Sequence, residues 1–352
     1  MADHAKWIFP AFRETILKRD ADKSTAFALQ TVSSTEDNMT WDIEQQLRWT
    51  TCAYIEDLAS LMEMPAAPSV LAQLYVQRFY MLHSFAKHDR FLVATAALFL
   101  AGKTEEFPIK VRLMTECGMY LLLCKPKENE KTHRPASRKR KSVDGRPVDM
   151  SASIGNDPEA ANAKHLDCLH ALLEKIDVGE IEMTSARVLL FERILLQTLS
   201  FDLGIPQPFA YVPRCMEPLF ALEAIHPSVS YDTVRSIAFL FLEDAIKSGL
   251  VLAFNCVELA TGAVYLACLY RNHVSSNVAT EKNEPWWSIW GMSAQQLEDV
   301  ARGILWMYED KDGKPRTGVS GDLKTLWDRF RPESNLPDLE YIKQLDADLT
   351  RH

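Results

Sequence analysis

Two groups of side chains in this sequence have types and spacings that could carry chemistry. Glu105 and Glu106 are adjacent carboxylates, which suit general acid–base catalysis, but no nucleophile or metal ligand stands near them in the sequence. His165, Cys168 and His170 are metal-ligating types, but their spacing is not a standard zinc pattern and no second ligand pair stands at a suitable distance. We therefore expect no catalytic residues, no metal and no cofactor.

A third group is basic. Residues 125–146 hold nine Lys or Arg against three acidic residues, a balance of +6, so the rest of the chain carries -15. The surrounding stretch has few large apolar side chains and several Pro and Gly, which predicts a largely disordered insertion over residues 125–182. Its basic cluster is either a nuclear import signal or a solvated loop that touches nucleic acid or acidic peptide; it consists of Arg138, Lys139, Arg140 and Lys141.

The composition limits the class of protein. Hydrophobic residues make up 47% of the 352 residues and charged residues 25%, which suits packed globular cores. The formal net charge of -9 argues against a nucleic-acid clamp. The seven cysteines form no Cys-x-x-Cys pair, which favours reduced, buried thiols inside a cell. The longest nearly apolar run, residues 91–102, is too short to span a bilayer.

The elements that must position these groups are helical. Apolar residues recur at helical spacing in several segments, and no comparable run of alternating strand pattern occurs. Ser293 and Gln296 form a capping-box pattern before one such segment. We expect Ser69 and Asp232 to cap two others.

Two segments are apolar almost all round and match each other. Residues 94–101 and 260–267 are identical at five of eight aligned positions. A helix without a polar face must be enclosed by other helices. The repeat therefore predicts an all-α protein of two helical bundles, each built around a buried central helix.

Such duplicated five-helix bundles resemble the cyclins and the related transcription initiation factor IIB. The motifs favour the cyclin T, K and L group; they lie at residues 78–85, 98–106 and 192–203. The resemblance implies two tandem cyclin boxes. Its boundaries are an N-terminal extension over 1–40, a first box over 41–203 that contains the insertion, a second box over 204–310 and a C-terminal tail over 311–352.

The resemblance also implies a function without catalysis. Cyclins bind a cyclin-dependent kinase through a Lys at the end of helix 3 and a Glu in helix 5. These match Lys103 and Glu192, while the repeat aligns Lys103 with Leu269, so only the first box keeps the pair. Three further residues are expected on the kinase-facing rim: Glu105, Glu106 and Phe107.

The sequence thus predicts a nuclear regulatory subunit that activates a transcriptional cyclin-dependent serine/threonine kinase acting on the RNA polymerase II C-terminal domain. A cyclin C or H type, serving the mediator or the initiation-factor kinase, is the alternative within the family. A factor-IIB-like scaffold that binds DNA and polymerase is the alternative outside it. We expect no membrane association and no direct sequence-specific contact with nucleic acid. In a nuclear protein the basic cluster would serve import.

Overall fold

The computed structural model describes residues 4–18, 37–124, 177–221, 230–270, 285–309 and 323–324. Regular structure within these ranges consists of α-helices and short 3-10 turns, without a strand, which confirms the all-α prediction. Across the same ranges, no helix has the length and apolar character needed to cross a membrane. The basic cluster of residues 138–141 and the His/Cys group of residues 165–170 lie outside the described residues.

The chain divides into two compact units. The unit that we call the first bundle holds residues 50–79 and 85–203. The unit that we call the second bundle holds residues 1–49, 80–84 and 204–352. The helices that contribute to the first are α3 (Trp41–Leu61), α4 (Ala66–Leu82), α5 (Arg90–Thr104), α6 (Val111–Cys124) and α8 (Val178–Thr198).

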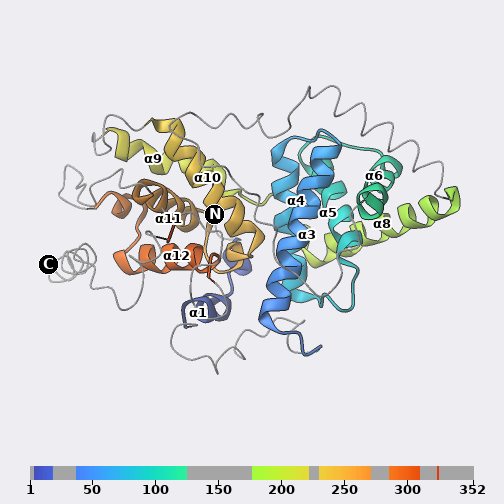
Figure 1. Ribbon diagram of the computed structural model, residues 1–352, viewed down its shortest axis with the longest axis horizontal. Helices are drawn as coiled ribbons and strands as arrows, with labels where there is room; N and C mark the ends of the chain where they lie inside the picture. Colours follow the sequence, from blue (N-terminus) through green and yellow to red (C-terminus); the bar gives the residue numbers. More distant parts are fainter. Residues whose placement is uncertain are drawn as a thin grey trace. The chain divides into compact units, whose positions relative to one another are not determined.

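Helix α5 is the central helix of the first bundle (Figure 1). Every residue from Leu92 to Gly102 is buried, as expected for a helix that lacks a polar face. Asp89 caps its first turn by accepting hydrogen bonds from the backbone N–H groups of Phe91 and Leu92. Because α5 has neighbours all round, the whole bundle holds its backbone in place.

Polar contacts tie α5 to the helices around it. Tyr54 of α3 shares a hydrogen bond of 3.1 Å with Thr95 of α5. Tyr75 of α4 donates to Thr104 of α5 at 3.3 Å. A methyl side chain at Gly118 of α6 would come within 2.7 Å of the Tyr54 hydroxyl, so α6 approaches this junction closely because Gly118 has no Cβ.

The second bundle has the same plan around α11, which lies between α10 and α12 (Figure 1). Residues Glu258 to Cys268 of α11 are all buried. A methyl side chain at Gly262 would come within 2.4 Å of Val300 in α12. The elements are η3 (Pro208–Tyr211), α9 (Val212–Ala221), α10 (Tyr231–Lys247), η4 (Leu250–Leu252), α11 (Cys256–Leu269), η5 (Trp286–Trp290) and α12 (Ala294–Trp306).

The N-terminal elements, η1 (His4–Trp7) and α1 (Pro10–Lys18), belong to the second bundle. Phe12 and Ile16 of α1 are buried in its core. The backbone N–H of Phe9 donates to the carbonyl of Leu252 at 2.7 Å. Residues 9–16 therefore complete the second bundle, although more than 190 residues separate them from its other helices.

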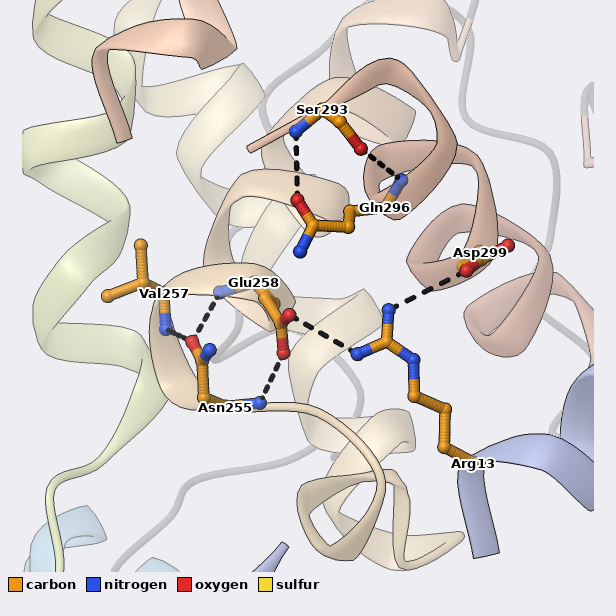
Figure 2. A network of polar contacts seen from close by, with 7 residues as sticks. All are labelled: Arg13, Asn255, Val257, Glu258, Ser293, Gln296 and Asp299. Atoms are coloured by element: carbon orange, nitrogen blue, oxygen red, sulfur yellow. Dashed lines mark hydrogen bonds and ion pairs between the residues drawn. The ribbon is translucent and has the colours of Figure 1, made fainter. Parts of the chain in front are cut away.

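A charged network fixes α1 in place (Figure 2). Arg13 lies 3.4 Å from a carboxylate oxygen of Glu258 and 3.6 Å from one of Asp299. The other oxygen of Glu258 accepts from the backbone N–H of Asn255, and Asn255 in turn caps α11. Glu258 thus completes a capping box and holds α1 at the same time.

The helix caps test the predicted helix starts. Ser293 and Gln296 form the predicted capping box of α12 (Figure 2). The prediction for Asp232 was wrong, because Ser230 caps α10 and Asp232 lies in the first turn. The prediction for Ser69 was also wrong, because α4 begins at Ala66 and tolerates Pro68 in its first turn. Helix α8 begins at Val178, before residue 182, where we expected the insertion to end.

Candidate functional site

The two residues that the sequence singled out meet in the first bundle. The ammonium of Lys103, in the last turn of α5, donates to a carboxylate oxygen of Glu192 in α8 at 2.7 Å. The Lys103 side chain is 44% exposed and that of Glu192 is 11% exposed. The pair therefore presents a cation at the surface and keeps most of its anion inside.

Helix packing positions each member of the pair. Glu192 lies on the inward face of α8, in register with the buried residues Val188 and Leu195. The same face packs against α5 and α6, and Ser185 of α8 is 3.1 Å from Thr115 of α6. Lys103 ends α5, where a positive charge complements the helix dipole.

An aromatic ring completes the surroundings of Lys103. Its ammonium lies 4.1 Å from the ring centroid of Phe99, one turn earlier in α5. Phe99 is buried, so its ring is fixed. The ammonium thus contacts a carboxylate and the negative face of an aromatic ring.

The three remaining predicted residues follow directly in the turn after α5. Glu105, Glu106 and Phe107 are all exposed. The turn is tight: the Phe107 N–H donates to the Gly102 carbonyl at 2.7 Å, and a Cβ at Gly102 would meet the Phe107 carbonyl at 2.8 Å. These three residues therefore follow Lys103 along the chain, and the Lys103–Glu192 ion pair does not include them.

Sequence analysis missed an exposed apolar stripe on α8 and just beyond it. Met183 is 67% exposed and Leu190, two turns later on the same face, is 45% exposed. Phe201, after the helix end, is 69% exposed. The seven-residue spacing of Met183 and Leu190 is visible in the sequence, but it becomes informative only once Val188, Glu192 and Leu195 are known to face inward.

The described residues offer little for catalysis. Within those ranges no cluster of three His, Cys, Asp or Glu could hold a metal ion. Burial raises the pKa of the Cys117 thiol to about 11 and that of Cys268 to about 12, so both stay protonated at neutral pH. Burial also raises the pKa of Tyr54 and of Tyr75 to about 12.

The chain is similar to known proteins of one family. The family model described as "Cyclin, N-terminal domain" matches residues 23–120. Cyclin-T1-3 of Oryza sativa subsp. japonica is 26% identical over 80% of this chain, and Cyclin-K of Danio rerio is 24% identical over 66% of it. These matches cover 46% and 43% of the relatives, so the chain spans less than half of their length.

A solved structure shares the fold. A chain of the yeast RNA polymerase II CTD kinase CTDK-1 complex superposes with a TM-score of 0.55 at 16% identity, over 85% of this chain and 80% of that one. The fold, the family model and the relatives agree. Residues 23–120 thus carry a cyclin N-terminal domain, and the chain as a whole is similar to cyclins T and K.

Proposed function

We propose that this chain is the regulatory subunit of a transcriptional cyclin-dependent serine/threonine kinase that phosphorylates the RNA polymerase II C-terminal domain. The observation that carries the proposal is the ion pair of Lys103 and Glu192 at 2.7 Å, at the family's two kinase-contacting positions. The other expected contact residues, from Glu105 to Phe107, follow Lys103 in one exposed turn.

The exposed stripe supplies apolar area for such an interface. Met183 and Leu190 lie on one outward face of α8, and Phe201 is exposed beyond its end. Phe201 is held firmly, because its N–H donates to the Leu196 carbonyl at 2.9 Å and its neighbour Asp202 pairs with Arg78 at 3.1 Å. Apolar residues fixed before binding contribute affinity without an ordering cost.

Activation follows from differential binding. A subunit that binds the active arrangement of a kinase better than the inactive one shifts the population toward the active arrangement. Burial of the apolar residues and pairing of the polar residues with kinase groups supply that difference. In this proposal the kinase supplies the reacting groups and the cyclin supplies binding energy.

The relatives support the choice of kinase and of compartment. The matching curated proteins are named as cyclins T and K, and the superposing structure is titled as a CTD kinase complex. These names favour a CTD-kinase cyclin over a cyclin of the C or H type. We place the protein in the nucleus on the same ground.

Affinity capture from nuclear extract tests the proposal. Wild-type chain should retain a protein kinase that phosphorylates a CTD repeat peptide, and Lys103→Glu should retain about 10- to 100-fold less. The matched control is Arg235→Glu, because Arg235 is 45% exposed and pairs with a carboxylate on α10. Equal kinase capture by Lys103→Glu and wild type would contradict the proposal, as would capture of DNA and polymerase without a kinase.

A further inference from the structure

We infer that Phe99 is a positioning residue for kinase binding: its ring fixes the Lys103 ammonium beside Glu192 in the orientation that the partner meets. The inference rests on the proposed function and adds a residue to its site. Phe99 itself is buried, so it acts through Lys103.

The geometry leaves the ammonium few positions. Phe99 and Lys103 are four residues apart on α5 and so lie on one face of the helix. The ring centroid is 4.1 Å from the ammonium, well within the range of a cation–π interaction, and the carboxylate of Glu192 is 2.7 Å away. Two attractive contacts from different elements hold one long, flexible side chain.

The need for this arrangement comes from the exposure of Lys103. A free Lys at a surface samples many rotamers, and fixing it on binding would weaken the complex. The ring and the carboxylate remove most of that freedom before the partner arrives.

The second bundle shows that the aromatic residue alone does not make such a site. The repeat aligns Phe99 with Tyr265, whose ring packs edge-on against Trp287 with centroids 6.0 Å apart. Four residues later stands Leu269, a partly buried apolar residue of the core. Both central helices thus carry an aromatic residue at this position, and in α5 a cation lies on the face of its ring.

A double-mutant cycle tests the coupling, using the kinase captured by the wild-type chain. Phe99→Leu removes the ring but keeps an apolar side chain, and should weaken kinase binding about five- to tenfold. In a Lys103→Met background the same change should have no further effect. Phe99→Tyr keeps the ring and should bind like wild type. Equal losses in both backgrounds would overturn the inference, because they would mean a packing role only.

A second readout needs no kinase. In isotope-labelled protein the Lys103 Cε resonance, assigned with Lys103→Arg, should be displaced by the ring current of Phe99. The displacement should vanish in Phe99→Leu and persist in Phe99→Tyr. An unchanged resonance in Phe99→Leu would overturn the inference alone. Failure of the wild-type chain to capture any kinase would overturn the proposed function, and this inference with it.

Discussion

The two central helices are built alike up to their last turn and differ there. Each buries a threonine that contacts another helix of its bundle: Thr95 meets Tyr54 of α3 at 3.1 Å, and Thr261 meets Cys215 of α9 at 3.5 Å. These contacts match the aligned positions of the internal repeat. The repeated part of the sequence therefore specifies a buried helix, and the features that the two copies share do not by themselves make a binding site.

The ends of the two helices carry the difference. Lys103 lies in the last turn of α5 beside Glu192, whereas Leu269, the last residue of α11, is a partly buried apolar residue packed against the core. Glu298, the counterpart of Glu192, lies 3.9 Å from Arg302 of its own helix. The residue in the last turn of the central helix, Lys103 or Leu269, thus decides whether a bundle presents a fixed cation at its surface.

Matched core truncations should have the largest effect. Leu100 in α5 and Leu266 in α11 occupy equivalent buried positions, so the two variants are Leu100→Ala and Leu266→Ala. Each should lower the free energy of unfolding by about 2–5 kcal/mol, because each leaves a cavity. Denaturant unfolding followed by circular dichroism measures both losses. A loss below about 1 kcal/mol at either position would contradict the equivalence of the two helices.

A charge swap separates the internal ion pair from its contact with the kinase. Lys103→Glu alone should lower stability by about 1 kcal/mol, a modest amount because Lys103 is partly exposed. Adding Glu192→Lys should restore stability. Kinase binding should stay at least about tenfold weaker than in the wild type, because the two charges that the kinase meets have exchanged places. Thermal unfolding and kinase capture report the two effects. Recovery of both would mean that the pair serves stability only.

Removal of the Arg13 network should affect the second bundle alone. Arg13→Ala loses two carboxylate contacts and the stacking of its guanidinium on Phe254 at 4.8 Å, so stability should fall by about 1–2 kcal/mol. The control is Arg112→Ala, which breaks an exposed pair with Glu116 and should cost below about 0.5 kcal/mol. Kinase binding should be unchanged in both. Equal stabilities of the two variants would show that the network does not hold α1.

Alkaline pH should weaken both bundles through their buried thiols. Burial raises the pKa of Cys117 to about 11 and that of Cys268 to about 12, so above pH 9 the unfolded chain loses protons that the folded chain keeps. Stability is therefore highest below pH 9 and falls as pH rises. Each thiol should contribute about 1 kcal/mol by pH 10. Cys117→Ala and Cys268→Ala should each make the measured decline shallower, and an unchanged slope would contradict this account.

Sequence patterns predicted more of the scaffold than of its details. The buried central helices and the Lys103–Glu192 pair could be predicted from the sequence, because a fully apolar segment and a family motif are local signals. The contact of Arg13 with Glu258 spans 245 positions, and no local pattern reports it. Phe99 was correctly interpreted as a core residue. Its contact with Lys103 was not predicted, because residue type alone does not show which side chain lies on the face of an aromatic ring. The cap at Asp232 failed because Ser230, two residues earlier, is an equally good cap, and the cap at Ser69 failed because α4 begins at Ala66 and includes Pro68 in its first turn.

The docking of α1 has a consequence for biosynthesis. Phe12 and Ile16 leave the ribosome early, yet the helix they pack against, α12, begins at Ala294. At about 5–20 residues per second, translation of the intervening chain takes roughly 15–60 s. During that time the face of α1 that packs on α12 lacks this native neighbour, and an early native contact open to it is Trp41, whose ring centroid lies 5.4 Å from that of Phe12 in the folded chain.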